Sequence, residues 1–118
     1  MVQYGRTSLD MSFAALSDAT RRGILERLGR ADASISALAE SFDMTLTGMK
    51  KHVSVLEQAG LVMTRKVGRV RMCRLGDCTL EAEAAWLRRH RDMWEARFNA
   101  LDRLVDELRR KESQDGPD

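Results

Sequence analysis

The sequence predicts a mainly α-helical fold that carries one small β-hairpin. Three observations predict it. Short apolar stripes with helical spacing recur between Leu9 and Ala59, and capping residues separate them. A basic, alternating segment with a central glycine follows at 62–75. The last third of the chain then repeats apolar residues at intervals of three and four, which is typical of a long helix.

The first part of the chain predicts two short helices. Leu9–Leu16 is the first apolar segment, and Asp18 can cap a second helix over Ala19–Leu28. Gly29 is expected to end that helix, and Arg30–Ala33 is interpreted as a polar link. The residues of the second helix expected to face the core are Ile24, Leu25 and Leu28.

Two further short helices with a tight turn between them are predicted at about 34–60. Ser34 or Ser36 caps the first, Asp43-Met44 forms the turn, and Thr45 caps the second, which runs to about Ala59 before Gly60. The core-facing residues expected here are Leu38, Ala39, Phe42, Leu46, Met49, Val53 and Leu56. Thr47, Gly48, Lys50, Lys51 and Ser54 are therefore expected to face outward from the second helix.

A two-stranded hairpin follows at about 62–75. Its strands are expected at Val62–Lys66 and Val70–Leu75, with Gly68 at the tip, where a positive φ is needed. The alternation of the second strand does not decide which of its faces is inward. A helix-turn-helix followed by a basic hairpin is a winged helix-turn-helix, an architecture used mostly to bind duplex DNA.

A long helix is expected from about Thr79 to Glu112. Its apolar positions follow a 3.5-residue repeat that only Arg91 interrupts; they are Leu80, Ala84, Leu87, Trp94, Phe98, Leu101, Val105 and Leu108. A helix on the order of 50 Å exceeds what a small domain can cover, so we expect part of the stripe to pack on a second subunit. The alternative is a helix packed within its own chain. A single domain is thus expected over 1–112, with a disordered tail at 113–118.

Charge is concentrated rather than general. The net charge of the 118 residues is only +2. The segment from Met44 to Arg74 contains seven basic residues and a single acid, Glu57, so its own charge is +6 and the rest of the chain carries −4. Such a patch favours a polyanionic partner, whereas the alternative is a merely solvated hairpin.

With neither an apolar run of membrane-spanning length nor a secretory signal near the N-terminus, we expect a cytoplasmic protein without a membrane partner.

The predicted DNA-binding residues lie on the second helix of the turn motif and on the hairpin. Thr47, Lys50 and Lys51 are placed to reach base edges, and Arg69 to reach the minor groove. Gly48 either permits a close approach to DNA or is only a weak point in the helix, and His52 either meets a phosphate or bonds at a helix–helix junction. The full set is Thr45, Thr47, Gly48, Lys50, Lys51, His52, Ser54, Arg65, Lys66, Arg69 and Arg71.

Catalysis is not expected. The sequence lacks a nucleophile paired with a base, paired carboxylates and a glycine-rich phosphate loop, and no cofactor is indicated. Cys73 and Cys78 are too few and too far apart for a metal site of the usual spacing, so two free thiols are expected.

Three segments resemble one family. LSDATRRGILERL, SALAESFDM and KKHVSVLEQAGLV are similar to the ArsR family of bacterial winged-helix repressors, over about Phe13–Leu75. The resemblance implies a homodimer that binds an operator palindrome, represses transcription and is released by an effector. It also implies a dimer interface on the first and last helices, for which the matching residues are Leu9, Phe13, Leu87, Trp94, Phe98, Leu101, Val105 and Leu108.

The chain departs from the metal-sensing members of that family. Those members carry a cysteine pair on the helix before the recognition helix, where this chain has the cysteine-free segment Ser36–Phe42. Others place Asp and several His on the last helix, where this chain has only His90. The segment DMWEARFNALDRL is similar to a subgroup that does not sense metals. We therefore expect a dimeric repressor with no metal and an unknown effector; the alternatives are a metal- or thiol-responsive repressor using Cys73 and Cys78, or a winged-helix protein-interaction module.

Overall fold

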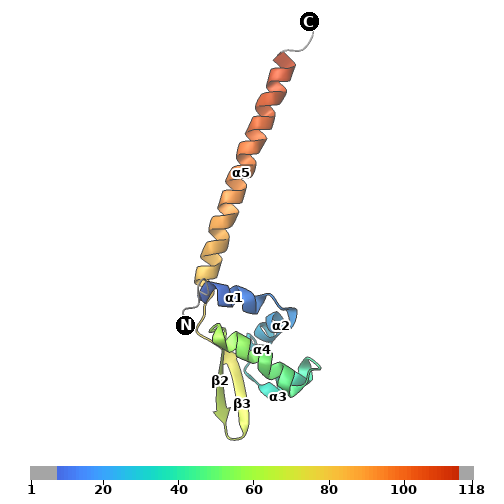
Figure 1. The fold of residues 1–118 in the computed structure, drawn as a ribbon, viewed down its shortest axis with the longest axis vertical. Helices are drawn as coiled ribbons and strands as arrows, with labels where there is room; N and C mark the ends of the chain where they lie inside the picture. Colours follow the sequence, from blue (N-terminus) through green and yellow to red (C-terminus); the bar gives the residue numbers. More distant parts are fainter. Residues whose placement is uncertain (1–7, 115–118) are drawn as a thin grey trace, which may run out of the picture. The chain divides into compact units, whose positions relative to one another are not determined.

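The computed structural model describes residues 8–114, and these divide between two compact units, Met1–Glu83 and Ala84–Asp118. Within its described residues, the first unit contains four helices and three strands, most of which are labelled in Figure 1. In chain order these are α1 (Ser8–Leu16), α2 (Ala19–Leu28), β1 (Ala33–Ser34), α3 (Ile35–Ser41), α4 (Leu46–Gln58), β2 (Val62–Val67) and β3 (Val70–Leu75). A last helix, α5 (Glu81–Gln114), makes up most of the second unit.

Side-chain caps begin three of the short helices, as predicted. Asp18 accepts the N–H of Arg21 at 3.0 Å, Ser34 accepts that of Ala37 at 3.0 Å, and Thr45 accepts that of Gly48 at 3.0 Å. Each cap satisfies an amide that has no partner in the first helical turn. Ser34, rather than Ser36, is therefore the cap of α3.

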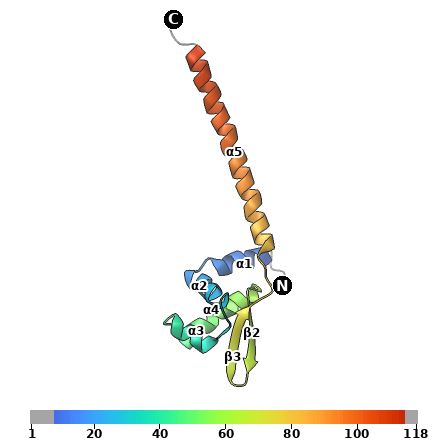
Figure 2. The same cartoon turned by 180° about the vertical axis from the view of Figure 1, so that it is seen from behind.

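The wing is a three-stranded sheet, so the prediction of two strands was incomplete. Its order is β1-β3-β2, and Ala33 and Ser34 pair antiparallel with Cys73 and Met72. Two residues are too short to show an alternating pattern, which is why the sequence indicated only a polar link there. Figures 1 and 2 show the β2–β3 hairpin extending beyond the helices of the first unit.

One apolar core holds the first unit together. It combines residues from α1, α2, α3, α4 and all three strands; the buried members are Ala15, Ile24, Leu28, Ala33, Ile35, Leu38, Ala39, Met49, Val53, Leu56, Leu61, Val62 and Cys73. Leu46 was wrongly predicted as a core residue, since it is 43% exposed. It is the first residue of α4, where the helix has not yet entered the core. Leu25 and Phe42 pack against the core but remain partly buried.

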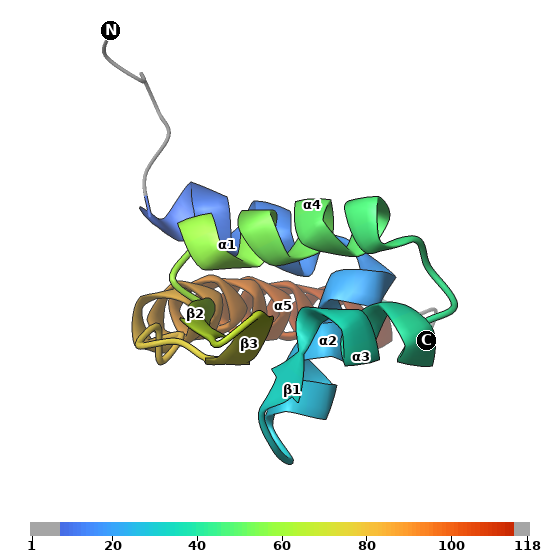
Figure 3. The same cartoon turned by 90° about the horizontal axis from the view of Figure 1, so that it is seen from below.

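The four helices of the first unit contact one another through short, close surfaces. Figure 3 shows α1 beside α4, and α4 also contacts α2, α3 and β2. Gly23 makes room for this packing, because a Cβ there would lie 2.8 Å from Cε1 of Phe42. The aromatic ring at the end of α3 therefore depends on a glycine in the middle of α2.

The last helix starts later and ends later than predicted. It begins at Glu81, and Leu80 before it has a φ of 62°, so Thr79 is not its cap. Ser113 and Gln114 are helical, which corrects the expected tail at its first two positions; residues 115–118 lie outside the described part. None of the helices in residues 8–114 combines the length and the apolarity that a membrane-spanning segment needs.

Two glycines lie at the base of the hairpin, Gly60 before β2 and Gly76 after β3. Gly60 takes a φ of 75° after α4, and its carbonyl accepts the N–H of Cys78 at 3.0 Å. Gly76 donates its N–H to Leu61 at 2.9 Å, and a Cβ on Gly76 would overlap the carbonyl oxygen of Gly60. The two ends of the hairpin can therefore approach each other only without a side chain at position 76.

Gly76→Ala is expected to destabilise the protein by about 2 kcal/mol or more, because the backbone of the hairpin base must shift. Thermal and urea unfolding followed by circular dichroism measure this loss. Gly29→Ala is the matched control, since Gly29 has a φ of −63° and an added Cβ would meet only ordinary contacts at 3.4 Å. Equal stability of the two variants would contradict this account of the hairpin base.

Candidate nucleic-acid interface

The helix α4 has one buried and one exposed face, as its sequence predicted from Met49 onward. Met49, Val53 and Leu56 are 0%, 3% and 0% exposed. The opposite side chains are exposed to solvent; they are Thr47, Lys50, Lys51 and Ser54. The burial of three side chains thus leaves two ammonium groups and two hydroxyls free to meet a ligand along one helix face.

The first turn of α4 explains Gly48 from within the protein. Its N–H donates to Oγ1 of Thr45, and a Cβ at position 48 would lie 3.1 Å from that same oxygen. Glycine therefore leaves room for the cap of the helix. The interpretation that Gly48 permits close approach to DNA stays a prediction beside this local reason.

His52 lies at a junction of helices. Its side chain is 20% exposed, and its Nδ1 is 3.2 Å from Nη1 of Arg21 on α2 and 3.8 Å from Oδ2 of Asp18. Of the two roles left open by the sequence, the geometry of Nδ1 fits the junction. The N–H of Arg21 that donates to Asp18 lowers the pKa of that carboxyl.

The strand register divides the basic residues of the wing between two faces. Lys66 pairs with Arg71 on the face that also carries the buried Cys73, whereas Arg65 pairs with Met72 on the other. Arg69 lies in the turn between the strands. The predicted wing residues are therefore all exposed, but they do not form a single surface.

Arg71 is connected to α4 through a chain of hydrogen bonds. Its Nη1 donates to Oγ1 of Thr64 at 3.0 Å, and that hydroxyl donates to Oε2 of Glu57 at 2.8 Å. Because Glu57 lies near the end of α4, this chain of hydrogen bonds joins the wing to α4 at an exposed edge. The sequence did not indicate this role for Thr64 or for the single acid of the basic region.

The two thiols differ in environment. Cys73 is fully buried, and burial raises the pKa of its thiol; the carboxylate of Glu57 raises it further, against the opposing charge of Arg71. Cys78 is half-buried, and its Sγ lies 4.0 Å from Oγ of Ser12. Within residues 8–114 no group of three or more His, Cys, Asp and Glu side chains is placed to hold a metal ion.

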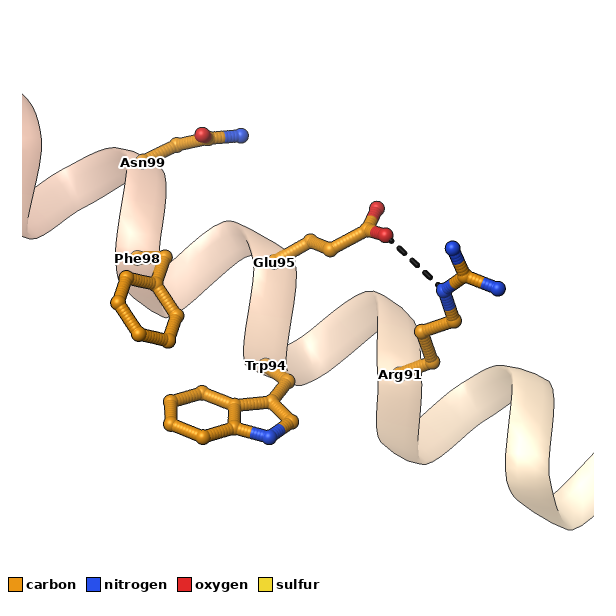
Figure 4. A pocket seen from close by; sticks show the side chains of 5 residues that line it. All are labelled: Arg91, Trp94, Glu95, Phe98 and Asn99. Carbon is orange, nitrogen blue, oxygen red and sulfur yellow. Dashed lines mark hydrogen bonds and ion pairs between the residues drawn. The ribbon is translucent and has the colours of Figure 1, made fainter.

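The middle of α5 presents aromatic side chains (Figure 4). The rings of Trp94 and Phe98 lie with their centroids 4.5 Å apart, while Arg91 donates to Glu95 at 3.1 Å on another side of the helix. A hollow of about 500 Å³ is lined by these four residues and Asn99. Since all five come from one helix, the hollow is an open surface rather than an enclosed ligand site.

We expect alkylating reagents to modify Cys78 well before Cys73 in the folded protein. The buried thiol of Cys73 has a raised pKa, so its reactive thiolate forms only as the pH rises above the ordinary range of a thiol. Iodoacetamide labelling followed by peptide mass spectrometry measures both rates, and labelling in urea is the control in which both sites react. Faster labelling of Cys73 than of Cys78 in the native protein would contradict the burial of this side chain.

Known proteins resemble this chain in both sequence and fold. The helix-turn-helix domain family matches residues 16–65. The HTH-type transcriptional regulator Rv2034 of Mycobacterium tuberculosis is 31% identical over 99 residues, which cover 84% of this chain and 90% of that protein. The transcriptional repressor SdpR of Bacillus subtilis is 29% identical over 75 residues, which cover 64% of this chain and 83% of that protein.

Solved structures extend the likeness to the fold. An ArsR-like transcriptional regulator from Rhodococcus sp. RHA1 is 38% identical with a TM-score of 0.73, covering 85% of this chain and 92% of its own. A crystal structure of another ArsR family transcriptional regulator is 43% identical with a TM-score of 0.68, covering 75% of this chain and 98% of its own. With its helix-turn-helix, wing and long last helix, this chain belongs to the ArsR family of winged helix-turn-helix, DNA-binding transcriptional regulators.

Proposed function

We propose that the protein is a dimeric repressor that binds an operator palindrome, with α4 in the major groove and the wing on the flanking backbone. The observation that carries this proposal is the exposed basic face of α4, which lies opposite the buried Met49, Val53 and Leu56. The similar protein from Bacillus subtilis is named a transcriptional repressor, which supports the direction of control.

Different residues have different tasks in this proposal. Thr47, Lys50 and Lys51 reach base edges near the N-terminal half of α4, where a groove-bound helix is closest to the bases. Lysine suits the acceptor atoms of guanine. Arg69 at the turn reaches the minor groove, while the remaining wing residues, Arg65, Lys66 and Arg71, contact phosphates. Thr45 begins the helix, and Ser54 extends its polar face.

The apolar stripe of α5 is the proposed dimer surface. Trp94, Phe98 and Leu101 are 55%, 49% and 54% exposed, which leaves large apolar side chains in water. Leu87, Val105 and Leu108 continue the stripe. Leu9 and Phe13 of α1, which are partly buried in the first unit, are the further residues proposed for the dimer interface. A homodimeric winged helix-turn-helix domain from Mycobacterium bovis has the same fold, with a TM-score of 0.59 at 23% identity.

The hollow on α5 is an open surface and does not indicate which effector the repressor binds. A thiol-responsive mechanism that uses both Cys73 and Cys78 is disfavoured, because Cys73 is buried and burial raises the pKa of its thiol. We propose no catalytic role: the similar proteins named above are transcriptional regulators.

Specific binding is expected to appear as selection of one duplex from a random library, preferred over a scrambled duplex by a factor of about 10³ and weakened steeply by salt. Lys50→Gln is expected to reduce affinity for the selected duplex by about ten- to a hundredfold. Fluorescence anisotropy at several salt concentrations measures both effects. Lys111→Gln, which removes the same charge from exposed α5, is the matched control. Equal binding to both duplexes would instead support a protein-interaction module.

Leu101→Ser is expected to shift the protein from dimer toward monomer, because it removes a large apolar side chain from the stripe. Sedimentation velocity over a range of protein concentrations measures the dissociation constant. Met93→Ser is the matched control, since Met93 is 65% exposed on α5 but lies outside the 3.5-residue repeat. A dimer unaffected by Leu101→Ser but lost in Met93→Ser would place the interface on another face of the helix.

A further inference from the structure

One side chain connects three helices of the first unit. Arg21, in the first turn of α2, donates from Nε to the carbonyl of Ala15 at 2.8 Å and from Nη2 to that of Ala14 at 3.1 Å. Both carbonyls belong to the last turns of α1. Its third nitrogen, Nη1, lies 3.2 Å from Nδ1 of His52 on α4. The guanidinium therefore ties the end of α1 directly to the middle of the recognition helix.

The contact with Arg21 favours one of the two tautomers of a neutral His52 imidazole. A guanidinium has only donors, so Nδ1 must accept, and the neutral imidazole then carries its proton on Nε2. Asp18 does not compete for Nδ1, because its Oδ2 is 3.8 Å away and already accepts the backbone N–H of Arg21. Nε2–H is thus left as the hydrogen-bond donor of the ring, one residue beyond Lys51 on α4.

We propose that Arg21 is a positioning residue for DNA binding. It holds α4 at a set distance from the end of α1 and orients the His52 ring, so that Nε2–H is presented as a donor to a phosphate. This inference rests on the proposed function, but it assigns Arg21 no contact with DNA. The same guanidinium contacts both α1 and the recognition helix, so a displacement of the end of α1 is expected to displace α4 as well.

A lysine at position 21 separates positioning from direct contact. Arg21→Lys keeps the positive charge, so a residue that merely meets a phosphate would retain most of its effect. A single ammonium cannot reproduce the planar fork that serves two carbonyls and an imidazole at once. A positioning residue is therefore expected to lose its effect in this variant although no charge is lost.

Arg22 supplies the matched control. It is the next residue in α2, and its Nη1 donates at 2.7 Å to the carbonyl of Leu16, also at the end of α1. Its hydrogen bond therefore stays at the corner between α1 and α2 and does not reach α4. Arg22→Lys changes the same chemical group at the same helix corner without disturbing His52.

The test measures binding to the duplex selected by the wild-type protein. Arg21→Lys is expected to weaken binding about tenfold, whereas Arg22→Lys stays within about twofold. In a His52→Ala background Arg21→Lys is expected to add less than about a twofold loss, because its target is already absent. Equal losses in the two lysine variants, or full additivity with His52→Ala, would overturn the proposal.

A second measurement needs no DNA. Nitrogen NMR of the wild-type imidazole at neutral pH is expected to show an unprotonated Nδ1 and a protonated Nε2. A proton on Nδ1 would overturn the inference, even if the Arg21→Lys variant failed to fold.

The proposed function and the role of Arg21 would be contradicted by different results. If the wild-type protein selects no duplex, the proposed function is wrong and the NMR result still tests the contact; if selection succeeds but Arg21→Lys binds normally, only the role of Arg21 is wrong.

Discussion

Burial of one face of α4 is the constraint on which the rest of the interface depends. Met49, Val53 and Leu56 are locked into a core shared with α2, α3 and the sheet, so the rotation of the helix about its axis is not free. With the rotation set, Lys50 and Lys51 must lie in solvent, because successive residues of a helix point about 100° apart. Arg21 of α2 then contacts the same helix from its side, at His52. The apolar face carries the stability, and the polar face is held in place as a consequence.

The wing takes its position from the same helix. The carbonyls of Gly60 and Leu61 accept the N–H groups of Cys78 and Gly76, which follow β3, and the absence of a side chain at Gly76 permits this close approach. Glu57 and Thr64 add a polar connection from α4 to Arg71. These contacts are side chain to side chain and partly exposed, so each contributes little alone. Together with the buried base of the sheet they hold the hairpin against α4.

In the second unit, large apolar side chains of α5 are exposed to solvent. Trp94 and Phe98 lie against each other, Trp86 stacks on His90 with ring centroids 5.3 Å apart, and the leucines beyond them remain about half exposed. Complete burial of such a side chain is worth about 1.5–3 kcal/mol, so covering the exposed half of each contributes roughly half of that and favours association. The stripe keeps its heptad spacing through Arg91, whose charge pairs with Glu95 along the same helix.

Local sequence patterns predicted the order of the helices, the caps Asp18 and Thr45, the turn at Asp43 and the two faces of α4, because these depend on neighbours only a few residues apart. They did not indicate the strand Ala33–Ser34, the start of α5 after Leu80 or the exposure of Leu46. The separation of Arg65 from Lys66 and Arg71 followed only from the strand register. The tie from Arg21 to His52 spans 31 residues, and no local pattern marks it. Only tertiary packing, which brings distant backbone carbonyls and rings within hydrogen-bond distance, could decide these features.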